Sequence, residues 1–267
     1  MGNQNENEIE NIYQKYRKSM IQIGKGRNSK IYKLEIKDKN AIYIIKEIDL
    51  RYLIYDQELI EVYQKLISIT MKIKNENVIK YYSFFKENDS LIVIMEYGGE
   101  TNLNQFIEKY RIKSELIGQE RIKDIIIQIC NGLKEFHNNS IILRCLNPYN
   151  IFIDNNHKIK ISLPLSIYLY DKNIHYQVRL KDFYIAYEII GGDKYTLKAD
   201  IWSLGCIIYE LFTLSNYCKD KVYYHEVKKI DTDIYNPKWQ KLIDLLLKLD
   251  YRKRPNIDEA LNFVQSI

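Results

Sequence analysis

The chain has 267 residues, of which 46% are hydrophobic, and a chain of this size and composition can bury a substantial core, which excludes disorder along its whole length. Lysine and arginine number 40 against 35 aspartates and glutamates, for a net charge of +5. The basic residues are scattered rather than gathered in a stripe, so the electrostatic signature of a nucleic-acid-binding protein is missing.

The first part of the chain predicts a small β-sheet. Residues 1–18 are polar and charged, which indicates a short helix or tail packed on the outside. Between residues 21 and 48, apolar residues alternate or form short β-branched groups, broken by GKGRNS and KDKN. This pattern is typical of antiparallel strands joined by tight turns. Residues 52–73 have helical apolar spacing, and NENVIKYYSFF and NDSLIVIMEY then return to strands.

The rest of the chain predicts mostly helix. Residues 121–137 carry apolar side chains at steps of three and four, which indicates one buried helix face. Residues 199–214 are apolar nearly all round, so we expect a central buried helix there. Between them lie the short strands IFID and KIKIS and an irregular segment, 163–187, of a length that is usually functional. WQKLIDLLLKL and NIDEALNFVQSI predict two closing helices.

The cysteines and the shortness of the apolar runs indicate the compartment. The cysteines form no CxxC pair and no metal-ligand spacing, so we expect no metal site and a reducing, intracellular setting, the cytoplasm. No window approaches the roughly 18 apolar residues of a membrane span. The start MGNQNENEIE is too polar for a signal peptide, and Glu6 stands where a myristoylation motif needs Ser or Thr. We therefore expect no membrane partner. The cysteines are Cys130, Cys145, Cys206 and Cys218.

Seven short motifs, taken together, resemble the eukaryotic protein kinase domain over residues 19–267, in order and approximate spacing. The most telling are ADIWSLG and RKRP. The resemblance implies an α+β, bilobal protein-kinase-like fold, forming one domain after a polar N-terminal extension at 1–18. A small antiparallel β-sheet lobe with one long helix spans 19–97, and a larger, mainly α-helical lobe spans 98–267. The motifs are IGKGRNSKI (23–31), YIIK (43–46), IMEYGG (94–99), ILRCLNPYN (142–150), AYE (186–188), ADIWSLG (199–205) and YRKRP (251–255).

The catalytic loop departs from the family pattern. Where kinases carry His-Arg-Asp, this chain carries Leu143, Arg144 and Cys145, so the aspartate that accepts the substrate's hydroxyl proton is missing. Cys145 lies among leucines without a cationic neighbour in sequence, and we expect its thiol to stay protonated. The catalytic-loop lysine is replaced by Asn147, whereas Asn150 matches the family's magnesium-binding asparagine.

The magnesium-binding triplet is also replaced. After KIKIS, where the family carries Asp-Phe-Gly, the chain reads Leu163, Pro164 and Leu165. The resemblance therefore implies the loss of the carboxylate that holds the metal on the transferred phosphate. Asp154 and Asp171 are the nearest acids in sequence, and we interpret both as structural, Asp154 within the turn IDNN.

The strand lysine of the small lobe matches Lys46, but its acidic partner does not. The helix position that carries a glutamate in the family is Leu66, and Glu61 lies about 140° away round the helix. An ordinary ion pair of Lys46 is therefore not expected, although a shifted helix could bring Glu61 or Gln64 to the lysine.

The nucleotide site itself is partly degenerate. Ser29 replaces the third glycine of the phosphate-binding loop. The family's small alanine above the adenine is Ile44 here, and with Ile31 and Phe152 it could fill the space of the purine at ordinary packing density. Met95 takes the position that guards the pocket, and Gly98 ends the expected hinge. The vestigial site comprises Gly24, Gly26, Ile31, Ile44, Lys46, Met95, Glu96, Tyr97, Asn150 and Phe152.

Residues that build the kinase fold are present. The resemblance implies a buried ion pair between Glu188 and Arg254, and Asp200 is expected to accept hydrogen bonds from backbone amides of the catalytic loop. The two catalytic carboxylates are missing, whereas the residues that build the fold remain. This combination predicts a catalytically inactive kinase-like domain, a pseudokinase. Such a domain would act as a scaffold or regulator by binding other proteins, such as an active kinase or a large assembly.

Two alternatives stay open. One is an atypical active serine/threonine-type kinase that transfers the γ-phosphate of ATP, and the other is a weak, metal-independent nucleotide switch. We expect no required cofactor and at most weak ATP binding. Arg144 could meet a phosphate on Tyr168, Tyr170 or Tyr176, although tyrosine is common throughout the chain. Residues 1–18 are either a candidate partner contact or a solvated helix, and we favour the solvated helix.

Overall fold

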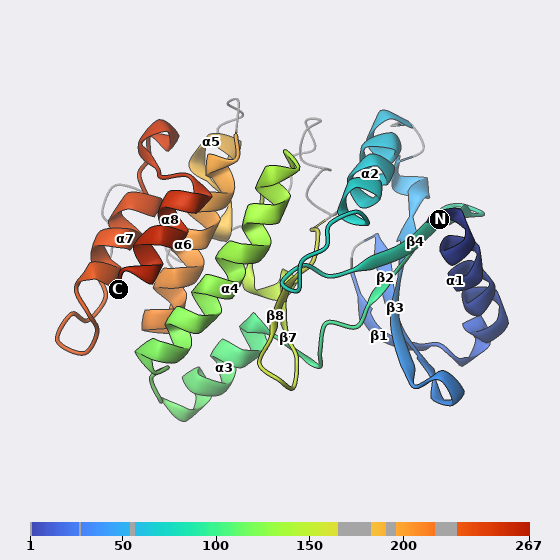
Figure 1. Ribbon diagram of the computed structural model, residues 1–267, viewed down its shortest axis with the longest axis horizontal. Helices are drawn as coiled ribbons and strands as arrows, with labels where there is room; N and C mark the ends of the chain where they lie inside the picture. The colour runs from blue at the N-terminus through green and yellow to red at the C-terminus, as the bar shows by residue number, and fades with distance from the viewer. Residues whose placement is uncertain (1, 27, 54–56, 165–182, 191–195, 217–228) are drawn as a thin grey trace. The chain divides into compact units, whose positions relative to one another are not determined.

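The chain forms two compact units, shown as a computed structural model in Figure 1. The first comprises Met1–Lys74 and Ile79–Gly98, and the second Asn75–Val78 and Gly99–Ile267. The structure describes residues 2–26, 28–53, 57–164, 183–190, 196–216 and 229–267.

The first unit is built on a five-stranded antiparallel sheet with the strand order β1-β2-β3-β5-β4. The first three strands pair in succession through short turns, as the alternating apolar pattern of residues 21–48 predicts. Two helices accompany the sheet. The elements are α1 (Gly2–Tyr16), β1 (Ile21–Lys25), β2 (Ser29–Ile36), β3 (Ala41–Asp49), α2 (Gln57–Thr70), β4 (Tyr81–Glu87) and β5 (Ser90–Glu96).

Helix α2 is shorter than the apolar spacing of residues 52–73 predicts. Residues Leu50–Leu53 form a 3-10 turn before it. At its end, the amides of Lys72 and Ile73 donate to the carbonyls of Ile69 and Thr70, at 3.0 Å each. Hydrogen bonds between residues three positions apart, as in a 3-10 helix, tighten the last turn of an α-helix and end it. The predicted helix is therefore confirmed, but its bounds were too wide at both ends.

Helix α1 covers one face of the sheet, which we call the outer face (Figure 1). Ile12 and Tyr13 are buried against a group of apolar sheet residues, and Ile9 and Tyr16 pack at the edge of the same group. These four side chains recur at the helical spacing i, i+3, i+4, i+7 and so share one stripe. The prediction of a short helix packed on the outside is confirmed, and the solvated-helix interpretation is wrong. The sheet residues are Leu34, Ile36, Ile45, Ile92 and Ile94.

Glu87, at the end of β4, accepts from three side chains of α1 and of the turn that follows it. Tyr13 Oη donates to Glu87 Oε2 at 3.0 Å, and Gln14 Nε2 donates to Oε1 at 3.0 Å. Arg17, just after the helix, pairs with the same Oε1 at 3.0 Å. The hydrogen bond from Gln14, together with those from Tyr13 and Arg17, lowers the pKa of Glu87 despite its partial burial. Ionised Glu87 therefore fastens α1 to the sheet.

The second unit is mainly helical. Helix α6 is buried along almost its whole length, and α4 and α8 pack against each other. The polar caps that begin α3 and α8 are complete capping boxes, from Asn102 with Gln105 and from Asn256 with Glu259. The helices are α3 (Leu103–Lys113), α4 (Gln119–Asn138), α5 (Tyr187–Ile190), α6 (Lys198–Thr213), α7 (Lys238–Leu246) and α8 (Ile257–Gln265).

The second unit also contains a small three-stranded sheet. Its strands are β6 (Thr101–Asn102), β7 (Ile151–Ile153) and β8 (Ile159–Ile161), in that order across the sheet. Buried Asn77 joins residues 75–78 to this unit, because its side chain donates to Ile159 O at 2.9 Å and its carbonyl accepts from Ile161 N at 2.9 Å. The expected boundary between 97 and 98 left these four residues with the small lobe.

The cysteines in the described part of the chain are buried, free thiols. Burial raises the pKa of Cys130 to about 12, so this thiol stays protonated at neutral pH and packs as a small hydrophobe. Cys218 lies outside the described residues. Among the helices that the structure describes, none has the length and apolar character to cross a membrane.

We predict that the contribution of Glu87 to stability depends on pH. Its lowered pKa means that the stabilisation is present above the ordinary carboxylate pKa and is lost as the pH falls through the lowered value. At pH 7, Glu87→Gln should lower the free energy of unfolding by about 1 kcal/mol. Urea unfolding of both proteins between pH 7 and pH 3 should show this difference shrinking with acidification. A difference that does not change with pH would contradict the assigned role.

Candidate functional site

The buried carboxylate of Asp200, in α6, holds the loop that follows α4. Its Oδ2 accepts from the backbone amide of Leu143 at 2.9 Å, and its Oδ1 accepts from that of Arg144 at 2.7 Å. The ring Nε2 of His137, at the end of α4, lies 3.0 Å from the same Oδ2. Arg144 has a φ of +65°, a conformation that non-glycine residues rarely adopt. Asp200 thus fixes a tight loop through backbone atoms, whatever side chains the loop carries.

Cys145, which the sequence motifs predict to replace the proton acceptor, is packed inside this loop. It is 3% exposed, and its amide donates to Leu143 O at 2.8 Å. Asn147 Nδ2 donates to the carbonyl of Cys145 at 2.9 Å and lies 3.4 Å from its sulfur. Asn147 Oδ1 in turn accepts from Tyr149 N at 3.0 Å. Asn147, in the position of the catalytic lysine, therefore closes the loop with its own side chain.

Asn150 lies beside the segment that carries Leu163, the first residue of the triplet that replaces Asp-Phe-Gly. The carbonyl of Asn150 accepts from the amide of Ser162 at 2.9 Å, and Leu163 follows directly. Leu163 is 2% exposed, and Pro164 is buried too. Leu165 lies outside the described residues. The position that the sequence motifs predict for the family's metal-binding carboxylate is thus a buried leucine.

No other acid compensates for this loss among the residues that the structure describes. Asp154 Oδ1 accepts from the amides of Asn156 and Lys158, at 2.8 Å each, and so is engaged in the β7–β8 turn. Asp171 falls in the part of the chain that is not described. Within the described ranges, no group of three or more His, Cys, Asp or Glu side chains could hold a metal ion. Asn150 with a leucine and a thiol does not fit magnesium, which requires hard oxygen ligands.

In the first unit, the strand register places the predicted nucleotide-binding residues on one face of the sheet. Ile31 lies opposite Lys46, and Ile44 lies opposite Met95. Because alternate residues of a strand share a face, these side chains point away from α1, whereas Ile45 points toward it. Ile31, Ile44 and Lys46 are half-buried, and Met95 is buried. Phe152 belongs to the other unit, so filling of the purine space stays a prediction.

The glycine turn is closed by Ser29. The amide of Gly26 donates to Ser29 O at 2.7 Å, and a Cβ on Gly26 would lie 2.6 Å from Ser29 Oγ. A side chain at position 26 would therefore require the Ser29 hydroxyl to move. Gly24 follows an irregularity in the pairing of β1 with β2, where a Cβ would make only ordinary contact with Ile31.

Helix α2 presents the residues expected near Lys46. Leu66 and Gln64 are half-buried and Glu61 is exposed, and the pairing of Lys46 stays a prediction. At the end of β5, Glu96 exchanges two hydrogen bonds with the backbone of Lys80, at 2.8 and 3.0 Å.

Tyr97, the next residue, has the ammonium of Lys33 5.0 Å from its ring centroid. Gly98 is buried.

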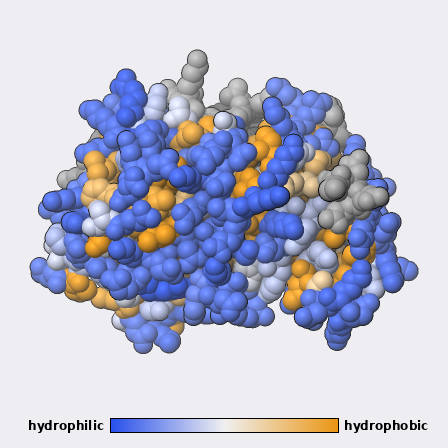
Figure 2. Space-filling view, in the orientation of Figure 1, coloured by the Kyte–Doolittle hydropathy of each residue, from blue (hydrophilic) through white to orange (hydrophobic). Residues whose placement is uncertain are grey.

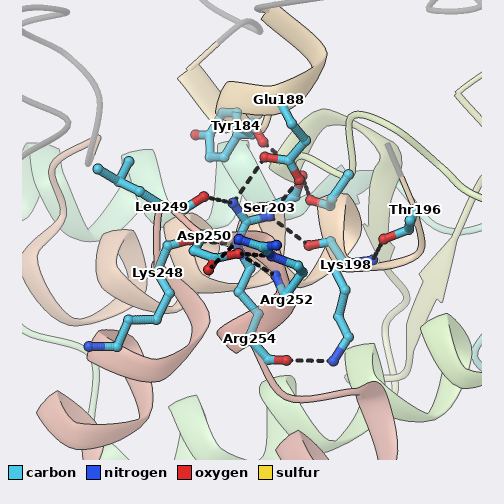
Figure 3. Close-up of polar contacts among 11 residues, drawn as sticks. Tyr184, Glu188, Thr196, Lys198, Ser203, Lys248, Leu249, Asp250, Arg252 and Arg254 are labelled. Atoms are coloured by element: carbon cyan, nitrogen blue, oxygen red, sulfur yellow. Dashed lines mark hydrogen bonds and ion pairs between the residues drawn. The ribbon is translucent and has the colours of Figure 1, made fainter. Parts of the chain in front are cut away.

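The second unit contains the predicted ion pair (Figure 3). Arg254 and Glu188 form two parallel hydrogen bonds of 2.7 and 3.0 Å, and both side chains are buried. Arg254 also donates to the carbonyls of Lys198 and Lys248, and its guanidinium lies 5.0 Å from the ring centroid of Trp202. One guanidinium thus joins α5 to the start of α6 and to the segment that follows α7.

A second buried cluster was missed at the sequence level. Glu210 of α6 accepts from Tyr184 Oη, from Asn216 Nδ2 at 2.7 Å and from Arg111 Nη2 at 3.2 Å. Burial raises the pKa of Glu210, and Tyr184 and Arg111 partly oppose that shift. The cluster ties α3 and residue 184 to α6. The sequence offered one sign of this cluster, a glutamate within an otherwise apolar helix, because a buried carboxylate needs hydrogen-bond partners.

The comparisons agree with these features. The model of the protein kinase domain matches residues 17–264. The chain belongs to the protein kinase family. Its α+β, bilobal kinase fold, expected from the sequence motifs, is thereby confirmed. Helix α1 precedes the matched region and is an addition to the common kinase domain.

Several curated relatives are kinases of the Nek group. The probable serine/threonine-protein kinase nek2 of Dictyostelium discoideum is 30% identical over 254 residues, which cover 90% of this chain and 60% of that protein. The serine/threonine-protein kinase Nek8 of Danio rerio is 31% identical over 257 residues, covering 93% of this chain and 36% of that protein. For Nek5 of Mus musculus the identity is 27%, with 90% and 38% covered. This kinase-family chain therefore spans between about a third and three fifths of the length of these relatives.

We predict that the buried ion pair is worth far more to this kinase fold than the surface pair beside it. Arg254→Gln leaves Glu188 buried without its partner, which typically costs about 3 to 5 kcal/mol. Arg252→Gln removes an exposed pair with Asp250 and should cost about 0 to 1 kcal/mol. Urea unfolding of the two variants measures both values. Equal losses would show that Arg254 is not the anchor of α5.

Proposed function

We propose that this kinase-family domain is a pseudokinase, catalytically inactive, and that it acts as a scaffold or regulatory module by binding other proteins. One observation carries the proposal: in a single compact unit, a buried leucine and a buried cysteine occupy the two carboxylate positions of phosphoryl transfer. Leu163 is 2% exposed and Cys145 is 3% exposed. Neither side chain can hold magnesium on a phosphate or accept a hydroxyl proton as an aspartate does.

Electrostatics explains why these two losses matter together. Phosphoryl transfer involves little covalent chemistry by the protein, and its rate depends on positioning and on neutralising charge on the phosphate. Without the metal-binding carboxylate, the main source of positive charge is lost. Without the aspartate, the attacking hydroxyl has no acceptor. Asn147, in place of the lysine, is engaged within the loop and adds no charge.

The alternative of an atypical active serine/threonine kinase has its own support. The relatives are named serine/threonine-protein kinases, and the chain retains Gly24, Gly26, Lys46 and Asn150. Activity would require metal held by other ligands and a base from the substrate. Retention of Lys46 and the glycine turn also supports a weaker role, in which nucleotide binds without metal and acts as a switch. We propose that no cofactor is required and that any ATP binding is weak.

The proposed partners are proteins, for example an active kinase or a larger assembly, rather than nucleic acid or membrane. The small net charge of +5 supports this choice over nucleic acid. We also propose a cytoplasmic location. Cys130, Cys145 and Cys206 are buried as thiols, which suits a reducing compartment. The proposed phosphate acceptors Tyr168, Tyr170 and Tyr176 lie outside the described residues.

We predict no metal-dependent nucleotide response from the purified domain. Thermal unfolding with ATP alone, with Mg²⁺ and with Mn²⁺ should give the same midpoint as without ligand, because the metal has no carboxylate to bind. Transfer of the γ-phosphate to the domain itself or to a generic acceptor should not exceed that of Lys46→Ala.

Each other outcome identifies an alternative. A shift that needs metal and disappears in Lys46→Ala, together with phosphate transfer, would overturn the proposal in favour of an active kinase. A shift with ATP alone that is lost in Lys46→Ala would indicate the metal-independent switch.

A further inference from the structure

We propose that helix α5 and the segment that follows α7 form a docking surface for an acidic, amphipathic segment of a partner protein. This α5–α7 surface consists of Tyr187, Ile190, Lys248, Leu249 and Lys253. It would serve the proposed protein-binding role, on which the proposal rests, and it adds the chemistry of the partner. All five residues belong to the second unit, so the surface does not depend on nucleotide binding by the first.

Large apolar side chains are exposed on both segments. Tyr187 and Ile190 of α5 are 49% and 56% exposed, and Leu249 is 38% exposed. Tyr187 and Ile190 are three residues apart, so they lie on the same side of the single helical turn. On the face of the molecule in Figure 2, apolar areas are small and separated by hydrophilic side chains. Exposed apolar side chains that gather on adjacent segments are typical of protein interaction sites.

The buried ion pair of Arg254 holds the two segments side by side (Figure 3). Its guanidinium forms two hydrogen bonds with Glu188 of α5, at 2.7 and 3.0 Å. It also donates to Lys248 O at 2.7 Å and to Leu249 O at 3.3 Å. Because Tyr187 directly precedes Glu188, the exposed side of α5 lies close to Leu249. Anchoring both segments on one buried group orders the surface in advance, which lowers the entropy cost of binding a partner.

The charge beside these apolar side chains is positive. Lys248 and Lys253 are exposed, and neither forms an ion pair with a carboxylate in the described part of the chain. Figure 3 shows the ammonium of Lys248 directed away from the buried ion pair. The acids of the two segments are already engaged, Asp250 with Arg252 and Glu188 with the buried guanidinium. An acidic partner therefore complements the surface, whereas a basic one is repelled.

These features specify the kind of partner. A helix with apolar side chains at i, i+3, i+4 and i+7 would cover Tyr187, Ile190 and Leu249, as in the recognition of amphipathic helices by apolar surfaces. Glutamates beside that stripe would meet Lys248 and Lys253. Nucleic-acid binding depends on many phosphate contacts, whereas two lysines border this surface. Membrane-surface helices bury a continuous apolar face, whereas α5 is a single turn of four residues.

The first test measures the fluorescence anisotropy of two labelled helical peptides with the full-length chain. One carries leucine at i, i+3, i+4 and i+7 and glutamate elsewhere, and the other has lysine in place of every glutamate. The glutamate peptide should bind at least about tenfold more tightly, and added salt should weaken its binding. Equal binding of the two peptides would show nonspecific adsorption and would sink the proposal, as would no binding of the glutamate peptide.

The second test locates the binding site with variants at exposed positions, where substitution leaves the fold intact. Ile190→Ser, Leu249→Ser and Lys248→Gln should each weaken binding of the glutamate peptide several-fold. The matched controls lie on α3 of the same unit, where Ile112 is 81% exposed and Lys109 is exposed. Ile112→Ser and Lys109→Gln should leave binding unchanged. Equal losses in the two sets would show that the peptide does not recognise the α5–α7 surface.

The third test uses vesicles with and without phosphatidylserine, to which the wild-type chain should not bind. Binding to the anionic vesicles that Lys248→Gln weakens would identify a membrane-docking surface and overturn the choice of a protein partner. Failure of the docking tests leaves the inactive-kinase proposal in place, because that proposal depends on nucleotide and phosphate-transfer assays. Conversely, phosphate transfer by the domain would refute inactivity without changing the peptide-binding result.

Discussion

The carboxylate of Asp200 is the constraint on which the rest of the candidate site depends. It is fully buried and accepts from two consecutive backbone amides, those of Leu143 and Arg144. A buried carboxylate is tolerated only when donors surround it, so the loop and the helix α6 stabilise each other. Because the donors are backbone groups, the loop keeps its shape when its side chains change. This arrangement explains how the loop can keep its shape with a cysteine at position 145.

Leucine and cysteine in place of the two aspartates also avoid the free-energy cost of burying a charged carboxylate. A carboxylate held at the position of Leu163 would need a metal or a cationic partner to offset its desolvation. Leucine at 2% exposure contributes apolar burial instead. Asn147 similarly replaces a charged side chain by one whose hydrogen bonds are made within the loop. The loop therefore satisfies these polar groups from within the chain, which is compatible with the proposed binding role.

Sequence patterns predicted the helices that are buried along one face or all round. The stripe of residues 121–137 and the apolar run of 199–214 correspond to α4 and α6, and the departures at Cys145 and Leu163 were readable from motif positions alone. What escaped prediction depends on partners distant in the chain. The polar cluster of Glu210 requires a residue from the segment around 184. The turn role of Asn147 requires the loop shape that Asp200 imposes.

The burial of helix α1 also depends on residues that are distant in the chain. Its stripe of Ile9, Ile12, Tyr13 and Tyr16 was visible in sequence but short, and a polar segment with one such stripe is equally compatible with solvent. Its burial is decided by the sheet, whose outer face carries an aliphatic centre from three strands. A face assembled from separated strands exists only in the fold, so neither segment alone predicts it. That face is more apolar than the water-facing side of an antiparallel sheet, and α1 covers it with Ile12 and Tyr13.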